Sequence, residues 1–337
     1  MTKSFIAGAT MMRALKMAAL LLPLSFGASH TNAQTLSLRL AHNLSASEPF
    51  NVAAERFAAE VGKRSNGSIK VAVYPSEQLG PNKEVLEMVK QGANVITLVD
   101  AGYLADYVPD FGVVQGPYLI KNPDDFQKLL ASDLYKGLVR DAKSKGIMPL
   151  AFNWYIGSRH VIANRPIRTL EDFKGLSIRV PPVPMFNRTF VGLGARPVTL
   201  QWSEVYTGLS QNVVNAAEAP LPTIYGSKLQ EVRKFVSLTG HFAAFLGVAM
   251  NAQTFDKLTP EQRTILVSEA EAAGDFLKKL TIEKEKVVRA DLVKEGVTFV
   301  EPADILPFQS ATASVYNEFP KWSPGLYQKV QAILQAK

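Results

Sequence analysis

The sequence has 337 residues, of which 47% are hydrophobic and 20% charged, so it can bury one large core or two ordinary ones. It has 37 Lys and Arg against 30 Asp and Glu, and they form no dense basic cluster interleaved with aromatic residues, which argues against nucleic-acid binding. It contains no cysteine, which excludes disulfides, thiolate catalysis, cysteine metal sites and a lipid-modified N-terminal cysteine.

The N-terminus has the pattern of a secretory signal peptide. Three basic residues and no acid precede a short apolar run, residues 17–28, and small residues ending at Ala33 form a cleavage pattern. The run is too short for a membrane span and is interrupted by Pro23. We therefore expect removal of residues 1–33 and a soluble periplasmic protein without a lipid anchor. Subtracting those three basic residues from 37 leaves 34 against 30 acids, about +4, a bias that suits anion capture.

The first half of the mature chain alternates strands and helices. Strands are expected at residues 36–41, 69–74 and 95–99, because apolar and β-branched residues gather there. Helices are expected between them, at residues 49–61 and 82–91, each closed by a glycine. This order predicts a parallel sheet with right-handed crossovers, whose ligands bind at the carboxyl ends of the strands.

A second α/β pattern begins near residue 153. A later strand, residues 242–250, is expected to carry the chain back to the first domain. The second pattern comprises strands at 159–163, 176–180, 197–200 and 213–217, and helices at 169–173, 183–193 and 202–211.

A long helix is expected to begin at Thr259. Pro260 follows as the first helical residue, and Gln262 completes a capping box. No proline interrupts the chain until Pro302, so the helix is predicted over residues 259–295. At 1.5 Å per residue it would be about 45 Å or longer, enough to run along both parts of the protein.

Patterns typical of enzymes and cofactor proteins are missing from the sequence. The four histidines have no spacing suited to a metal site, and no serine lies in a Gly-x-Ser-x-Gly turn. The glycines at 192 and 194 lack the further glycine of a dinucleotide-binding loop and end a helix instead of opening one. We therefore expect no catalytic residue, metal or cofactor.

Polar and aromatic residues at strand ends are the candidates for a binding site. Arg179 lies at the end of a short strand, two residues before Pro181, and its planar guanidinium can bind a carboxylate with two hydrogen bonds. The structural alternative is an Arg179 paired with an internal acid. Each of three other candidates also has a structural explanation: Trp202 as a core residue, Arg159 as part of a salt bridge, and Glu218 as a surface or ion-paired acid. The candidate set is Asn43, Asp100, Arg159, Arg179, Trp202 and Glu218.

An ordered series of motifs resembles a known family over residues 36–319. The chain resembles the solute-binding proteins of tripartite ATP-independent periplasmic (TRAP) transporters, of the C4-dicarboxylate- and sialate-binding type. The motifs are Ala41-His42-Asn43, Tyr74-Pro75-Ser76-Glu77-Gln78-Leu79-Gly80, Gly157-Ser158-Arg159, Arg179-Val180-Pro181 and Glu218-Ala219-Pro220-Leu221.

The resemblance implies roles for the candidate residues. Arg179 matches the arginine that forms a bidentate bridge to the ligand's carboxylate, and Arg159 matches a second arginine that assists it. Asp100 falls where an acid faces ligand hydroxyls, Trp202 where an aromatic residue covers the ligand, and Asn43 near a ligand-contacting asparagine.

The last motif also contains a departure from the family pattern. Glu218 completes the predicted ligand-binding set. The next residue is Ala219, where the family has an asparagine that hydrogen-bonds the ligand. This change removes a polar contact and makes a sialic-acid-like ligand less favoured.

The fold implied by the resemblance is a two-lobe α/β periplasmic binding protein of the Venus-flytrap type. Lobe I would comprise residues 34–156 and 245–284, and lobe II residues 157–244 and 310–337, with the long helix shared by both.

The function implied is a periplasmic receptor that captures a small organic acid between two lobes and delivers it to the small and large membrane subunits of a TRAP permease. A monomer is the default expectation. The ligand is left open among C4-dicarboxylates, sugar acids, hydroxy acids and sulfonates. The alternatives are the binding component of an ATP-driven importer, and a periplasmic enzyme with Asp100 and Glu218 as acid and base.

Overall fold

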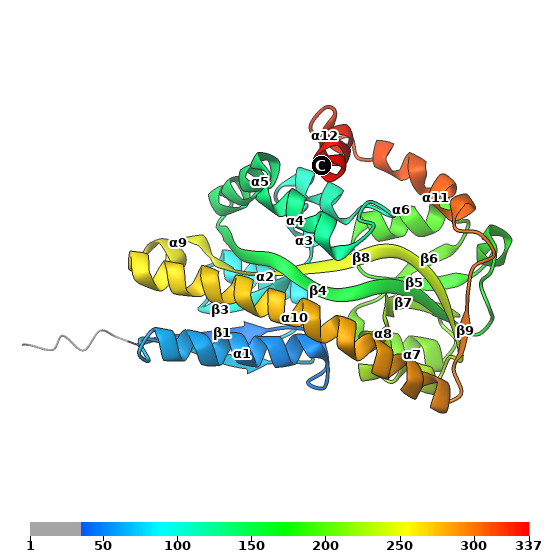
Figure 1. The fold of residues 1–337 in the computed structure, drawn as a ribbon, viewed down its shortest axis with the longest axis horizontal. Coiled ribbons are helices and arrows are strands. Elements are labelled where there is room, and N and C mark those ends of the chain that lie inside the picture. Colours follow the sequence, from blue (N-terminus) through cyan, green and yellow to red (C-terminus); the bar gives the residue numbers. More distant parts are fainter. Residues whose placement is uncertain (1–34, 337) are drawn as a thin grey trace, which may run out of the picture. The chain divides into compact units, whose positions relative to one another are not determined.

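A computed structural model describes residues 35–336, and the predicted signal peptide lies outside them. Nine strands of this part form one mixed sheet in the order β2-β1-β3-β8-β4-β7-β5-β6, with β9 beside β8 (Figure 1). The strands are β1 (Leu36–Ala41), β2 (Ile69–Tyr74), β3 (Val95–Val99), β4 (Ile147–Ala163), β5 (Ser177–Val180), β6 (Arg196–Thr199), β7 (Ala216–Pro220), β8 (Phe235–Asn251) and β9 (Thr298–Val300).

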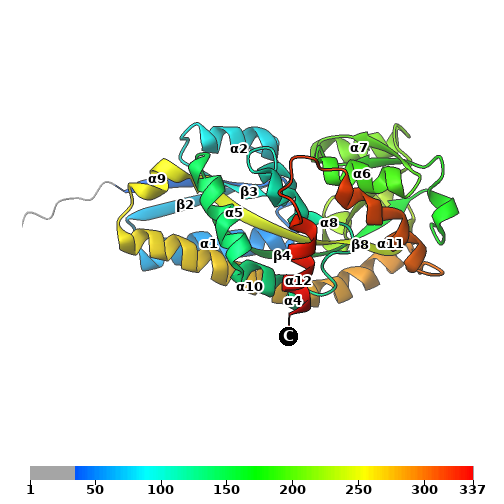
Figure 2. The same cartoon turned by 90° about the horizontal axis from the view of Figure 1, so that it is seen from above.

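Helices cover both faces of the sheet (Figure 2). None of those within residues 35–336 is long and apolar enough to cross a membrane. The α-helices are α1 (Pro49–Arg64), α2 (Asn82–Lys90), α3 (Ala101–Leu104), α4 (Pro123–Ala131), α5 (Asp133–Ser144), α6 (Pro184–Gly192), α7 (Val205–Ser210), α8 (Leu221–Gly226), α9 (Ala252–Asp256), α10 (Pro260–Lys294), α11 (Leu306–Thr312) and α12 (Leu326–Gln335). Five short 3₁₀ helices are η1 (Pro109–Gln115), η2 (Leu170–Phe173), η3 (Trp202–Glu204), η4 (Leu229–Glu231) and η5 (Ala313–Asn317).

The sheet has two parallel halves that are joined by long antiparallel strands. One half pairs β1 with β2 and β3, and the other pairs β5 with β6 and β7. Strands β4 and β8, of 17 residues each, pair with one another and link the halves. This is the two-lobe α/β arrangement expected from the sequence. The residue bounds of the lobes stay a prediction, because both halves belong to one continuous sheet.

The two linking strands are longer than predicted. The sequence indicated strands at residues 159–163 and 242–250, whereas β4 begins at Ile147 and β8 at Phe235. Nearly all of β4 from Ile147 to Gly157 is buried, so no alternation of apolar and polar residues marks it as a strand. Arg159 consequently lies inside a strand and does not open one.

The strand around Glu218 is shifted toward the C-terminus from its predicted position at residues 213–217. The observed strand β7 is Ala216–Pro220, so Glu218 lies in its middle and does not follow it. Asn212 has a left-handed backbone (φ 57°), and Val213 is 55% exposed. The turn at Asn212 therefore delays the strand, and apolar character alone predicted the wrong start.

The long helix is confirmed. Helix α10 has 35 residues and begins with the predicted capping box between Thr259 and Gln262. Its first half contributes Leu266 and Leu277 to the core beneath β1 and α1, and its second half contributes Leu292 to the core beneath β7. Figure 1 shows α10 crossing from α1 to α8. One helix thus packs against both halves of the protein.

Candidate functional site

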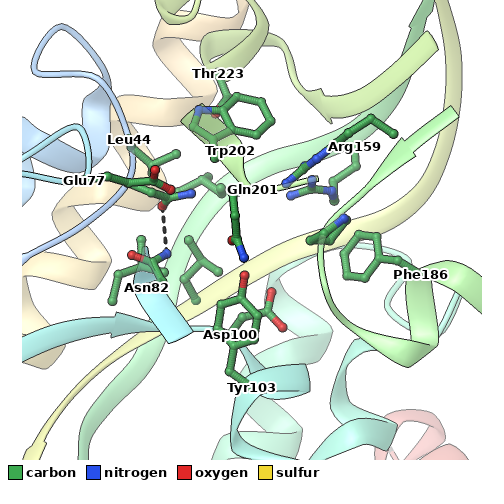
Figure 3. Close-up of a pocket in the computed structure, with 16 residues that line it drawn as sticks. Leu44, Glu77, Asn82, Asp100, Tyr103, Arg159, Phe186, Gln201, Trp202 and Thr223 are labelled. Atoms are coloured by element: carbon green, nitrogen blue, oxygen red, sulfur yellow. Dashed lines mark hydrogen bonds between the residues drawn. The ribbon is translucent and has the colours of Figure 1, made fainter. Parts of the chain in front are cut away.

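A pocket lies where the carboxyl ends of β1, β3, β5 and β7 approach one another (Figure 3). Two walls of different chemistry face each other across it. The amide wall, from the half with β1–β3, consists of Asn43, Glu77, Asn82, Asp100 and Tyr103. The arginine wall, from the other half and the adjoining part of β4, consists of Arg159, Arg179, Phe186, Gln201 and Trp202. Five of the six predicted site residues therefore line one pocket.

Arg179 is a buried cation anchored by the main chain. It is 3% exposed, and its Nε and Nη2 donate to the Leu200 carbonyl at 2.9 and 2.8 Å. It belongs to none of the ion pairs found within residues 35–336. Burial lowers the pKa of Arg179 to about 10, so the side chain is still charged at neutral pH. The described residues thus supply no acid to pair with it, and its Nη1 and Nη2 hydrogens can bind an anion.

Trp202 is partly buried and packs both against this arginine and against the edge of the core around β7. The Arg179 guanidinium carbon lies 5.1 Å from the centre of the Trp202 ring. The indole Nε1 donates to the Ser227 hydroxyl at 3.2 Å, which orients the ring. A capping box between Gln201 and Glu204 starts η3 and holds Trp202 at the rim of the pocket.

Arg159 is held by an internal acid. Its Nε donates to Glu218 Oε2 and its Nη2 donates to Oε1 at 2.7 Å. Glu218 is fully buried and also lies 3.4 Å from His241 Nε2. Burial alone would raise the pKa of Glu218, but the Arg159 charge and its hydrogen bonds hold it below its usual value. Glu218 is not among the residues lining the pocket, so its place in the structure is behind Arg159.

Arg159 also lines the pocket, beside an aromatic ring. Its guanidinium carbon lies 5.0 Å from the centre of the Phe186 ring, and both side chains line the pocket. The sequence left open whether Arg159 forms a salt bridge or faces a ligand. The structure shows the salt bridge, which uses one edge of the guanidinium, and also places Arg159 at the pocket; its contact with a ligand stays a prediction.

The amide wall is held by hydrogen bonds within its own half. Asn82 Nδ2 donates to Asn43 Oδ1 at 2.9 Å. Asp100 caps α3 by accepting from the Gly102 N–H at 2.7 Å, and its other oxygen accepts from Gln115 Nε2. Burial raises the pKa of Asp100. The wall thus offers amides and carboxyls, which match ligand hydroxyls better than a carboxylate.

Several pocket residues were not identified from the sequence: Glu77, Asn82, Tyr103, Phe186, Gln201 and Thr223. Each follows the carboxyl end of a strand within ten residues, a signal that could have found them. Ala219, where the resemblance implies an asparagine that contacts the ligand, is fully buried among apolar residues and does not line the pocket, so the predicted loss of a ligand contact there stays a prediction. Within residues 35–336 no group of three or more potential ligands could hold a metal ion.

Comparisons with known proteins identify a family and several similar structures. Residues 40–321 match the family described as "Bacterial extracellular solute-binding protein, family 7". The chain is 32% identical over 300 residues to the sialic acid-binding periplasmic protein SiaP of Vibrio cholerae, covering 89% of this chain and 92% of that relative. A TRAP periplasmic solute-binding protein from Ochrobacterium anthropi, solved with bound L-fuconate, is 36% identical with a TM-score of 0.87, covering 89% and 100% of the two chains. Another, from Actinobacillus succinogenes 130z with bound L-galactonate, is 34% identical with a TM-score of 0.86, covering 88% and 99%.

Proposed function

The chain belongs to the bacterial extracellular solute-binding proteins of family 7, and from this premise we propose that it is the periplasmic receptor of a TRAP transporter for a small organic acid. The two similar structures named above hold sugar acids, so sugar acids are the first ligands to test. Its partner would be the membrane permease of the transporter, which the loaded receptor would approach as a monomer.

The observation that carries the proposal is the buried charge of Arg179, which forms no ion pair among residues 35–336. An ion removed from water is strongly destabilised unless a counter-charge and hydrogen bonds replace the water. Within the described residues the Leu200 carbonyl satisfies one edge of the guanidinium, and no carboxylate forms an ion pair with it. A ligand carboxylate at the other edge would supply both the charge and two parallel hydrogen bonds.

Ligand capture would be coupled to closure of the two halves. A ligand held by both walls has its full set of contacts only when the walls are close together, so it shifts the open–closed equilibrium toward the closed form. A direct contact between the halves also favours this form: Thr223 in α8 donates to Glu48 Oε2, at the start of α1, at 2.7 Å. Both side chains are buried, and such a contact would stabilise the closed form.

The positions of the two candidate acids, Asp100 and Glu218, support binding and not catalysis. An enzyme with Asp100 and Glu218 as acid and base would need both carboxyls to reach the same ligand. Glu218 is fully buried behind Arg159 and does not line the pocket. Of these two acids, therefore, only Asp100 lines it. An ATP-driven importer would use a similar receptor, and the family assignment favours the TRAP permease.

Titration calorimetry with the purified protein tests the proposal. L-fuconate, L-galactonate and a C4-dicarboxylate would be titrated separately, and recovery of the unchanged acid would be checked by mass spectrometry. We expect saturable binding of at least one acid without turnover. Failure of every acid to bind, or chemical conversion of a bound acid, would contradict the proposal.

A further inference from the structure

Glu77 brings a negative charge to the side of the pocket opposite Arg159 (Figure 3). It lies in the loop after β2 and forms none of the ion pairs found among residues 35–336. Its charge is close enough to raise the pKa of Arg179, although burial of Arg179 has the larger, opposite effect. Glu77 and Arg179 therefore act on the same ligand space from two sides.

The backbone holds Glu77 in place. Ser76 and Glu77 both have left-handed backbones, with φ values of 55° and 59°, which residues other than glycine rarely adopt. The Ser76 N–H donates to the Leu44 carbonyl at 3.0 Å, and the Glu77 N–H donates to the His42 carbonyl at 3.1 Å. These bonds tie the loop to the segment after β1, so a strained turn is kept at the rim of the pocket.

The charges of the two walls provide for one carboxylate only. On the arginine side, Arg159 and Arg179 carry two positive charges, and Glu218 neutralises one of them. A single ligand carboxylate balances the remaining charge. On the opposite side stands the acid Glu77, and among residues 35–336 the basic residues lining the pocket are the two arginines of the arginine wall. A second carboxylate at the far end of a ligand would meet Glu77 and no cation.

We propose that Glu77 makes this receptor select acids with one carboxylate and a neutral, hydroxylated far end, and reject the dicarboxylate of equal length. The inference rests on the proposed function, because it needs the ligand's carboxylate at Arg179.

The neutral side chains beside Glu77 suit such a far end. The hydrogen bond from Asn82 to Asn43 uses one amide hydrogen of Asn82 and one oxygen lone pair of Asn43. The amide nitrogen of Asn43 and the oxygen of Asn82 are left to donate to and accept from ligand hydroxyls. Figure 3 also places the Gln201 side chain between Trp202 and Asp100. Hydroxyls can both donate and accept, whereas a carboxylate can only accept and would repel Glu77.

Three acids with the same four hydroxyl-bearing carbons isolate the effect of the far end. L-fuconate ends in a methyl group, L-galactonate in a hydroxymethyl group and galactarate in a second carboxylate. We expect the native protein to bind galactarate at least about tenfold more weakly than L-galactonate, because like charges oppose each other there. Glu77→Gln keeps the size of the side chain and removes its charge, so the affinity ratio of L-galactonate to galactarate should narrow by at least about fivefold, whatever the change in affinity for the monocarboxylates themselves.

Matched controls keep the result specific. Glu55→Gln makes the same charge change on the exposed face of α1 and should leave the ratio unchanged. In the native protein, a higher salt concentration should also narrow the ratio of the affinities for L-galactonate and galactarate, because salt screens the charge of the partly exposed Glu77. This measurement needs no variant.

The outcomes separate this inference from the proposed function. If L-galactonate binds but galactarate binds equally well, or if Glu77→Gln leaves the ratio as it was, the role of Glu77 is overturned and the receptor function stands. If none of the three acids binds to either protein, the sugar-acid receptor is overturned, and the role of Glu77 with it.

Discussion

The two walls of the pocket are built in different ways. The arginine wall holds its charges in regular strands, with Arg179 anchored to the Leu200 carbonyl and Arg159 to Glu218. The amide wall takes Asn43, Glu77 and Asn82 from loops and a helix start. Strands fix side chains more firmly than loops do. The comparison indicates that the arginine wall, which we propose binds the carboxylate, is the more firmly fixed one, whereas the amide wall can change its side chains without altering the sheet.

The largest effect is expected from removing the acid that supports the arginine wall. Glu218→Gln leaves Arg159 buried without a counter-charge, and breaking such a pair costs about 3–5 kcal/mol of unfolding free energy. Urea unfolding of the ligand-free proteins measures this loss of unfolding free energy. Glu283→Gln, an acid exposed on α10 without an ion pair among residues 35–336, is the control and should change stability little. Equal midpoints for native protein and Glu218→Gln would contradict a supporting role for Glu218.

Arg179→Ala should weaken ligand binding by roughly 300-fold, about 3.5 kcal/mol, because two charge-assisted hydrogen bonds are lost together. Calorimetry with the best-binding acid measures the change. Arg196→Ala removes an exposed arginine from β6 in the same half and serves as the control. Near-native affinity of a folded Arg179→Ala protein would show that the carboxylate binds elsewhere.

The contact between the halves should respond to pH. Burial raises the pKa of Glu48 from 4.5 to about 7, so between these values the folded protein binds a proton that the unfolded chain releases. The unfolding free energy therefore falls as pH rises through this window, by about 3 kcal/mol in total. Glu48→Gln cannot titrate and should lose this dependence, so it should match the native protein at pH 4.5 and exceed its stability at pH 8.

Urea unfolding of both proteins at several pH values isolates this contribution, because the other titrating groups are the same in the two chains. Parallel stability profiles for native protein and Glu48→Gln would mean that Glu48 does not titrate in this range.

The smallest effect concerns the aromatic cover of the arginine wall. Trp202→Ala should weaken binding by about tenfold, because a cation–π contact and apolar cover over Arg179 are lost. Trp202→Phe keeps a ring in place and should recover most of the affinity. If Trp202→Phe binds as weakly as Trp202→Ala, the indole hydrogen bond to Ser227 matters more than the ring face.

Local patterns predicted much of the fold. The capping box at Thr259 and the absence of proline until Pro302 predicted α10, because helix starts and breaks depend on neighbouring residues. Strand β4 was predicted too short and β7 in the wrong place. A strand buried on both faces has no alternation to read, and the turn at Asn212 is a matter of backbone conformation.

The sequence by itself determined the chemistry available at the strand ends: an arginine before a proline at Arg179, an acid at Asp100 and an aromatic residue at Trp202. Only the tertiary structure decided how these groups are used. It paired Glu218 with Arg159 and left Arg179 without an ion-pair partner among the described residues. The sequence contained the acid and the two arginines but did not show which of them would pair. Ion pairing depends on distances between strands far apart in the chain, and those distances exist only once the sheet has formed.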